Sequence, residues 1–579
     1  MEAESTIKGL VKNTDGFEFI SKTLESWGIC MYAGVTGGGV IHFLKDIPPL
    51  KGTPGDKPEF LNLAEYGAGF MPLGYYLAKG EIAAAVATTG AATKLIGCGL
   101  SDCKYHDIPA VYIVPISNPS EDGLSPLQDT SKYGNNILEQ LKAELPDSVF
   151  VFDNPTTIGQ KLSEAKVQLD KSKPVVFVLD NEVLGKPLKK LPVVKPTQAL
   201  AFKNEEIKGF IEDFRKSLNG KRLVVLVGEE MARYKDAKNI TTLFCQELKP
   251  ATIWSMNGAN AIARDNAYGY GYISFGGNDK AMSIYKSLNK NDVLLVLGAS
   301  FDEYTVNLKE IKASHTFFAG NIPDAYTLVN NSMKHVVKGE YTQIMAPLDI
   351  VLKQITESAK ANPFANKPVE PAPINLNDKP FAKPREGFVD MAILYQQLDN
   401  WWPSHSIAIN DVCLAYKDHQ YVVQRPNDNI MFYSLYRGSA MGGAYGIAIG
   451  AKLANPKDPV FLFTGDGCFR LFAGSMGEVR NLGMVMFVLN NKDLSIVGQG
   501  LDVILPDVPE ENYHSYLHAI DYCGVAKACG WDAEKLDANL LNLDSILKKI
   551  NGKMKRSLLI EIPVDPQQLL GSNPRLENL

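Results

Sequence analysis

Short, continuous apolar runs recur along the chain, and longer stretches with helical periodicity separate them. In order they are GICMYAGV, IAAAVATT, AVYIVPI, VVFVLD, LVVLVG, DVLLVLG, HTFFAG, SIAIND, PVFLFTGDG and MVMFVLNN. Runs of this length, bounded by Gly, Asn or Asp, are typical of strands that are buried on both faces of a sheet. The sequence therefore predicts an α/β fold built from doubly wound, mainly parallel sheets.

Two irregular segments divide the chain. The first begins at Lys186 and reads KPLKKLPVVKPTQALAF, and the second, residues 361–386, reads ANPFANKPVEPAPINLNDKPFAKPRE and is richer in proline. Charged, proline-punctuated segments of this kind are typical of linkers. They leave three blocks, residues 1–185, 200–355 and 386–579, and each is long enough to bury its own core.

The charge and the cysteines exclude several classes of protein. The 59 basic and 65 acidic residues are spread along the chain, so no basic stripe for nucleic acid is expected. The beginning, MEAESTIKGLVKNTDGFEF, has no signal-peptide pattern, and no apolar run reaches the length of a membrane span. Eight sparse cysteines without zinc-site spacing indicate reduced thiols. We expect a cytoplasmic protein that binds neither membranes nor nucleic acid.

The stretch FTGDGCFR lies at the end of one predicted strand, residues 459–464. Helical residues follow from 471 to about 481, and a second predicted strand, 484–489, ends in a pair of asparagines. This order makes one βαβ unit, whose right-handed crossover brings both strand ends to the same edge of the sheet. Because ligands of open α/β sheets lie beyond the carboxyl ends of strands, we expect Asp466 and Asn491 to share one ligand.

The residue types at this turn favour a magnesium ion and a diphosphate. Gly465 and Gly467 allow the backbone to approach a ligand closely, and the following helix offers free N–H groups to an anion. One carboxylate from Asp466, one amide from Asn491 and backbone carbonyl oxygens form a donor set that Mg²⁺ prefers. Taken separately, Gly-Asp-Gly could be a tight turn and Asn-Asn a strand cap.

The segment GDGCFRLFAGSMGEVRNLGMVMFVLNN resembles the thiamine diphosphate signature, which begins with GDG and ends with NN at about this spacing. By this resemblance the chain is identified as a member of the superfamily that includes acetolactate synthase, pyruvate decarboxylase and benzaldehyde lyase. The resemblance implies that Gly465, Asp466, Gly467, Asn491 and Asp493 contact the cofactor. It also implies that Mg²⁺ is bound by the side chains of Asp466 and Asn491 and by the backbone carbonyl of Asp493.

Two further segments extend the resemblance. LNLAEYGAGFMPLGYYLAKGEIAAAVATTG is similar to the segment that carries a glutamate near the pyrimidine ring of the cofactor, and Glu65 stands at that position. The alternative is an ordinary acidic residue at a helix N-terminus. RGSAMGGAYGIAIGAKLANP resembles the loop whose large apolar residue lies between the two cofactor rings, which implies that Gly438 and Met441 bind the cofactor, although methionine is more often core filling.

Weaker matches concern the substrate. SPLQDTS places Gln128 where related carboligases carry a glutamine that faces the substrate. GVTGGGVIHFL is similar to a glycine-rich loop over the active site, with Thr36 and His42 as candidate pocket residues, although His42 is more simply a surface histidine. His106 in KYHDIPA lies near the site by analogy only.

The resemblance also implies the role of each block and the assembly. Residues 1–185 would form the pyrimidine-binding domain, 200–355 a central sheet domain and 386–579 the diphosphate-binding domain. In the family the cofactor lies between two subunits, so a homodimer would be the smallest active unit and a homotetramer is common. The partners are then a second copy of this chain and small-molecule substrates.

The implied reaction is cleavage or formation of a carbon–carbon bond, as in a lyase or carboligase that acts on a 2-oxo acid and a carbonyl acceptor. The chain has no His-His dipeptide, which disfavours a simple pyruvate decarboxylase. NNKDLSIVGQG places Gly500 where acetolactate synthases carry a tryptophan, which puts acetolactate as the product in doubt. The alternatives are a non-ligating 2-oxo acid decarboxylase and an inactive relative with a regulatory or binding role. FAD in the central domain is a further option that GYGYISFGG does not support.

Overall fold

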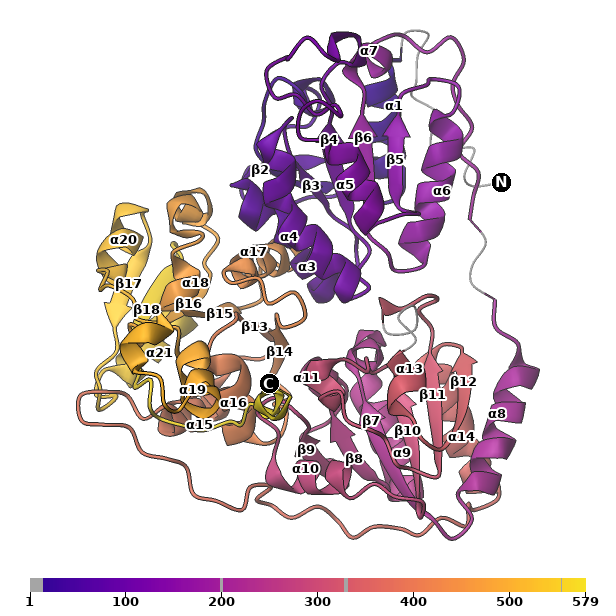
Figure 1. The fold of residues 1–579 in the computed structure, drawn as a ribbon, viewed down its shortest axis with the longest axis vertical. Coiled ribbons are helices and arrows are strands. Elements are labelled where there is room, and N and C mark those ends of the chain that lie inside the picture. The colour runs from indigo at the N-terminus through magenta and orange to yellow at the C-terminus, as the bar shows by residue number, and fades with distance from the viewer. Residues whose placement is uncertain (1–13, 198–200, 327–331, 553, 579) are drawn as a thin grey trace. The chain divides into compact units, whose positions relative to one another are not determined.

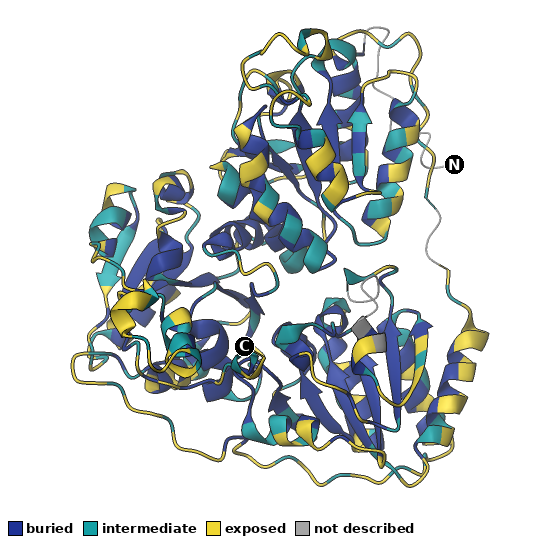
Figure 2. Cartoon of the chain, in the orientation of Figure 1, coloured by how far each residue is buried: buried dark blue, intermediate teal, exposed yellow. Residues whose placement is uncertain are grey.

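The computed structural model describes residues 14–197, 201–326, 332–552 and 554–578. It contains three six-stranded, all-parallel sheets with helices packed against them (Figure 1), which confirms the predicted fold class. The central strands of each sheet are almost completely buried, as Figure 2 shows, and this burial is why their sequences are continuous apolar runs. Among the described residues, no helix is both long and apolar enough to cross a membrane.

The first sheet has the strand order β2-β1-β3-β4-β6-β5. Its strands are β1 (Met31–Gly34), β2 (Glu59–Asn62), β3 (Ala84–Val86), β4 (Val111–Pro115), β5 (Val149–Phe152) and β6 (Val175–Leu179). Its helices are α1 (Gly16–Ser26), α2 (Ile41–Leu44), α3 (Glu65–Lys79), α4 (Ala91–Tyr105), the 3₁₀ helix η1 (Pro119–Glu121), α5 (Ile137–Glu144), α6 (Ile158–Asp170) and α7 (Asn181–Leu184).

The second sheet has the order β12-β11-β10-β7-β8-β9. Its strands are β7 (Arg222–Val227), β8 (Ala251–Trp254), β9 (Gly269–Tyr272), β10 (Asp292–Leu297), β11 (His315–Gly320) and β12 (Glu340–Met345). Its helices are α8 (Asn204–Ser217), η2 (Glu229–Arg233), α9 (Ala237–Leu248), η3 (Asn257–Ala261), α10 (Asp279–Lys286), α11 (Glu303–Val306), α13 (Ser332–Val336) and α14 (Leu348–Ala361).

The third sheet has the order β14-β13-β15-β16-β18-β17. Its strands are β13 (Ser406–Asn410), β14 (Ile430–Ser434), β15 (Val460–Gly465), β16 (Val485–Asn490), β17 (Asp532–Lys535) and β18 (Leu558–Pro563). The helices of this block are α15 (Met391–Trp401), α16 (Ala415–Val423), α17 (Gly443–Ala454), α18 (Asp466–Phe469), η4 (Ala473–Val479), α19 (Ser495–Ile504), η5 (Glu510–Tyr513), α20 (Tyr522–Ala528), α21 (Leu543–Asn551) and η6 (Pro574–Glu577).

The predicted βαβ unit is present, with β15 and β16 paired in parallel. Its connection differs from the expected single helix over 471–481, because it consists of the four-residue helix α18 and the separate 3₁₀ helix η4. Glycines at 474 and 477 lower the helix propensity of this stretch, which accounts for the interruption. Asp466 is therefore the first residue of a very short helix.

The chain forms two compact units that do not follow the sequence order of the three blocks. One contains the first sheet together with residues 437–460 and 472–484, and the other contains the second and third sheets. Helix α17, from the third block, thus packs against α3 of the first. Residues 185–197 and 201–203, before α8, and residues 362–390, before α15, form no helix or strand, and the predicted linkers fall largely in these ranges.

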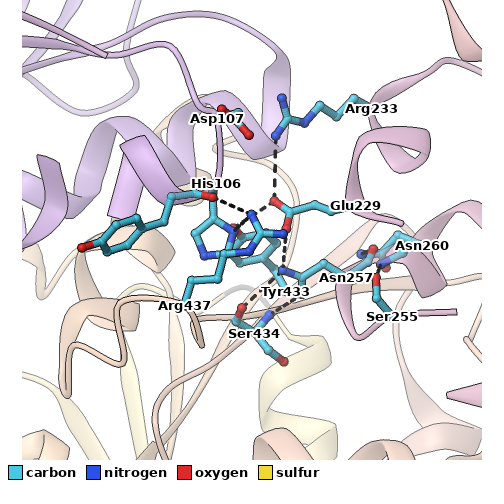
Figure 3. A network of polar contacts seen from close by, with 12 residues as sticks. His106, Asp107, Glu229, Arg233, Ser255, Asn257, Asn260, Tyr433, Ser434 and Arg437 are labelled. Atoms are coloured by element: carbon cyan, nitrogen blue, oxygen red, sulfur yellow. Dashed lines mark hydrogen bonds and ion pairs between the residues drawn. The ribbon is translucent and has the colours of Figure 1, made fainter. Parts of the chain in front are cut away.

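The edge strand β14 is paired by two asparagine side chains. Asn257 accepts a hydrogen bond from the Ser434 amide at 2.8 Å and donates to the Ser434 carbonyl at 3.3 Å, and Asn260 makes the same pair of contacts with Phe432. Figure 3 shows Asn257 beside Ser434. Because exposed strand edges invite pairing with other chains, these amides complete the edge within the molecule.

Helices α3 and α17 approach each other closely through glycines. A methyl group built on Gly446 would lie 2.1 Å from the carbonyl oxygen of Gly67, and one on Gly74 would lie 1.8 Å from that of Ile447. Both distances are far below van der Waals contact. The small residues of these two helices are therefore explained by backbone-to-backbone packing.

We expect Gly446→Ala to destabilise the protein by about 1–3 kcal/mol, because the added methyl group must push α17 away from α3. Urea denaturation of the variant measures this loss. Gly97→Ala is the matched control, since a methyl group there meets nothing within 4 Å and should be neutral or slightly stabilising in a helix. Equal effects of the two substitutions would contradict the packing argument.

Candidate functional site

The order of the third sheet reverses between β13 and β15, and this defines its ligand crevice. From β13 the chain continues outward to β14, whereas β15 is followed on the other side by β16. In doubly wound sheets, ligands bind at such a point, outside the carboxyl ends of the strands. Asp411 follows β13 and Asp466 follows β15, so both carboxylates stand at this position.

Asp466 connects the ends of β15 and β16. Its side chain is 1% exposed, and its two oxygens accept hydrogen bonds from the Gly467 amide at 2.9 Å and from the Lys492 amide at 2.6 Å. The structure therefore brings Asp466 to the residue that follows Asn491. Burial raises the pKa of the Asp466 carboxyl to about 6. A carboxylate in such a place is stabilised by a nearby cation.

Asn491 and Asp493 form the turn that follows β16. The side-chain oxygen of Asn491 accepts a hydrogen bond from the Asp493 amide at 3.0 Å. A methyl group built on Gly498 would lie 3.0 Å from the Asp493 carboxylate, so the Asp493 side chain faces α19. The Asp493 carboxylate therefore points toward α19. The backbone carbonyl of Asp493, rather than its carboxylate, remains the candidate metal ligand.

The donor chemistry at this turn fits a magnesium ion. No cluster of three or more His, Cys, Asp or Glu side chains suited to a metal occurs among the described residues. A metal here would have to use one buried carboxylate, one amide and backbone carbonyl oxygens, which are hard oxygen donors of the type Mg²⁺ takes together with phosphate oxygens and water. Asp466, Asn491 and Asp493 supply that set.

Asp411 and Cys413 also lie at the carboxyl-end edge of the third sheet, next to Thr464 and Gly465, and the sequence patterns did not single them out. Asp411 is fully buried and accepts hydrogen bonds from the Thr464 hydroxyl at 2.8 Å and the Val412 amide at 2.9 Å. A methyl group on Gly465 would lie 3.2 Å from Cβ of Cys413. The available signal was the position of Asp411 at the end of SIAIND, since a polar residue after a buried strand belongs to the ligand edge.

Glu65 and Met441 lie in the same compact unit. Glu65 is half-buried and is the first residue of α3, three residues after Asn62, the last residue of β2. The hydroxyl of the next residue, Tyr66, donates a hydrogen bond to the carbonyl oxygen of Met441 at 2.5 Å. Gly438 donates its amide to Asp102 at 3.0 Å. The structure therefore brings the predicted Met441 segment to the start of the helix that carries Glu65.

Gln128 is exposed and has a left-handed backbone, with φ of 62°. A methyl group built on Gly90, the residue before α4, would lie 3.0 Å from Cβ of Gln128. Its side chain thus starts directly over the N-terminus of α4. Thr36 is also exposed, and His42 is an exposed residue stacked on Phe17 with ring centres 6.0 Å apart.

The ligand edge of the central sheet does not fit a flavin diphosphate. Its strand order reverses between β7 and β10, and Glu230 follows β7. The buried Glu230 carboxylate accepts a hydrogen bond from the Asn321 amide at 2.7 Å and stands 3.2 and 3.3 Å from methyl groups built on Gly298 and Gly320. A protein carboxylate thus occupies the space over the glycines, where a diphosphate would meet it as a like charge.

Comparison with known proteins agrees with this geometry. Residues 413–562 match the family model of the thiamine pyrophosphate enzyme C-terminal TPP-binding domain. The chain is 23% identical over 512 residues to acetolactate synthase isozyme 1 large subunit of Escherichia coli, covering 84% of each protein. It is 22% identical over 503 residues to the acetolactate synthase large subunit of Lactococcus lactis, covering 85% of this chain and 83% of that protein.

A solved structure has the same fold. It is the thiamine diphosphate-dependent 4-hydroxybenzoylformate decarboxylase of Rhodococcus jostii, to which the chain is similar with a TM-score of 0.75 and 15% sequence identity. The match covers 95% of this chain and 99% of that one. The arrangement of three α/β sheets is therefore shared over nearly the whole length.

Proposed function

We propose that this chain, a member of the thiamine diphosphate-dependent superfamily, is a magnesium-dependent carbon–carbon lyase or carboligase that acts on a 2-oxo acid. The observation that carries the proposal is the buried carboxylate of Asp466, held by the amides of Gly467 and Lys492 at the point where the sheet order reverses. It lies within the residues that match the thiamine pyrophosphate-binding domain.

The residues divide into those that hold the cofactor and those that act during the reaction. When bound, thiamine diphosphate supplies a carbon nucleophile that adds to carbonyl groups and accepts the electrons released on decarboxylation. Asp466, Asn491 and the carbonyl of Asp493 would hold Mg²⁺, and Gly465 and Gly467 would let the backbone approach the diphosphate.

Gly438 and Met441 contact the rings of the cofactor in this proposal. Glu65, the first residue of α3, would exchange a proton with the pyrimidine through its carboxyl group. Gln128 faces the substrate, to which its exposed amide can offer both a donor and an acceptor.

The proposal includes the roles of the three blocks. Residues 1–185 form the pyrimidine-binding domain, 200–355 the central domain and 386–579 the diphosphate-binding domain. The active form is a homodimer or a homotetramer in which Glu65 and Asp466 of different copies serve one cofactor, and it works in the cytoplasm. The match of residues 413–562 to the TPP-binding domain and the position of Asp466 directly after β15 support the role given to the third block.

Gly500 bears on which product forms. It is buried in α19, and a methyl group built on it would lie 3.2 Å from the Leu576 side chain. A larger side chain at 500 would therefore require Leu576 to move. Gly500 stands in place of the tryptophan that the acetolactate synthase resemblance implies, so a side-chain contact to the second oxo acid is missing, and we favour a carbonyl acceptor other than a second pyruvate.

The reaction is tested with pyruvate in the presence and absence of an aldehyde, with thiamine diphosphate and Mg²⁺ supplied. We expect carbon dioxide release and a hydroxy ketone that contains the aldehyde carbon atoms. Release of acetaldehyde alone in both mixtures would indicate the alternative, a non-ligating decarboxylase. A protein that is stabilised by the cofactor but turns over none of a panel of 2-oxo acids would be an inactive relative.

A further inference from the structure

The segment 437–441 is fixed at both of its ends within one compact unit. At its start, the Arg437 guanidinium donates a hydrogen bond to the Tyr105 carbonyl at 2.7 Å, and one of its nitrogens lies 3.5 Å from Nδ1 of His106. Figure 3 shows Arg437 beside His106. At its end, the Met441 carbonyl accepts the hydrogen bond from Tyr66. The segment therefore connects the C-terminus of α4 to the N-terminus of α3.

Asp102 of α4 lies directly against the middle of this segment. One oxygen of its carboxylate accepts a hydrogen bond from the Gly438 amide at 3.0 Å. A methyl group built on Gly438 would lie 2.4 Å from that oxygen and 2.7 Å from the other. Both oxygens thus face the glycine, and no residue with a side chain can take the place of Gly438 while Asp102 stays where it is.

Packing does not explain a carboxylate at this position. Asp102 is 0% exposed, and within the described part of the chain its second oxygen, Oδ2, has no hydrogen-bond donor. Burial raises the pKa of Asp102 to about 6, against the opposing charges of His106 and Arg437. A buried carboxylate with one neutral donor costs stability, and an apolar residue would pack into α4 without that cost.

We propose that Asp102 is a positioning residue that fixes the Gly438–Met441 segment and thereby the Met441 side chain. This inference rests on the proposed function, because Met441 is placed at the cofactor only there. Asp102 acts through the backbone of Gly438 and touches neither cofactor nor substrate. Tyr66 holds the other end of the same segment, so the position of Met441 is determined from α4 and α3 together.

The test compares Asp102→Ala with Asp102→Asn. In the cofactor-free protein, hydrogen–deuterium exchange at the Gly438 amide should be at least about tenfold faster in Asp102→Ala, because its acceptor is lost. The concentration of thiamine diphosphate that gives half-maximal activity should rise by about the same factor, with kcat at saturating cofactor less affected. Asp102→Asn keeps an acceptor oxygen and should restore both quantities to within about threefold of the wild type.

Asp180→Ala is the matched control. Asp180 is also a buried aspartate of the first block, and it caps α7 by accepting hydrogen bonds from the Glu182 and Val183 amides. Its loss should lower thermal stability while leaving Gly438 exchange and the half-saturating cofactor concentration unchanged. If Asp102→Ala kept the wild-type exchange rate at Gly438 and the wild-type half-saturating cofactor concentration, the inference would be overturned.

A second pair of variants covers the case in which Asp102→Ala does not fold. Gly438→Ala should raise the half-saturating cofactor concentration, and Asp102→Ser in the same chain should partly reverse the effect by removing the clash. Strictly additive effects would overturn the inference. The exchange measurement uses the cofactor-free protein, so it tests the contact between Asp102 and Gly438 by itself. Failure of the wild type to bind thiamine diphosphate would refute the proposed function without changing the result of that measurement.

Discussion

Replacement of Asp466 by alanine is expected to abolish the stabilisation of the protein by thiamine diphosphate and Mg²⁺. In the wild type, a ligand at a hundredfold excess over its dissociation constant adds about 2.7 kcal/mol to the free energy of unfolding. The Asp466 carboxylate is the only charged donor of the proposed metal site, so its loss should weaken binding by two orders of magnitude or more. Thermal unfolding with and without cofactor and Mg²⁺ measures the difference.

Asp521→Ala is the control for this variant. Asp521 is the N-cap of α20 and accepts a hydrogen bond from the Gly524 amide at 2.8 Å, so its removal costs about 1 kcal/mol of stability through loss of a helix cap. Its response to cofactor should equal that of the wild type. A magnesium-dependent increase in melting temperature that persists in Asp466→Ala would contradict the assigned metal site.

The strands that frame the site follow from local sequence. Their buried apolar runs predict β15 over 459–464 and β16 over 484–489, and the structure places each within one residue of those limits. Parallel pairing then follows from the crossover rule, which brings Asp466 to the turn after β16. Strand burial on both faces is a strong signal because it removes polar residues from the whole run.

Half-exposed edge strands carry no such signal. β12 reads EYTQIM and β17 reads DAEK, and neither is an apolar run, because one face of each is open to solvent. β18, LLIEIP, has the same apolar signal as the predicted strands and is absent from the predicted set. β12 and β17 are strands because they pair with the buried strands β11 and β18, and their own composition does not predict this.

The contacts that hold Gly438 depend on tertiary packing and have no local signature. Asp102 and Gly438 are 336 residues apart, and they meet because α17 packs against α3, which in turn packs against α4. In the sequence alone, the glycines of α17 could indicate either the end of a helix or a close contact between two helices. Only the neighbouring backbone, such as the Gly67 carbonyl against Gly446, shows which applies.

Replacement of Glu65 by glutamine should lower kcat by about 10²–10⁴-fold while the cofactor-induced stabilisation is retained. Glutamine keeps the shape and the hydrogen-bonding oxygen of the side chain but can neither hold nor release the proton that the proposed mechanism assigns to it. The alternative, an acid that only favours the N-terminus of α3, is worth about 0.3–1 kcal/mol of stability and nothing in turnover. Initial rates and thermal unfolding of the same preparation distinguish the two.

Glu59→Gln controls for the loss of a carboxylate on the same strand–helix unit. Glu59 begins β2, at the end of the strand opposite to α3, and accepts a hydrogen bond from the Gly55 amide at 3.0 Å. The Glu59→Gln variant should retain the wild-type kcat. If Glu65→Gln also turned over at the wild-type rate, the proton would have to be handled by another group, and the structural position of Glu65 at the first turn of α3 would have only its helix-stabilising effect.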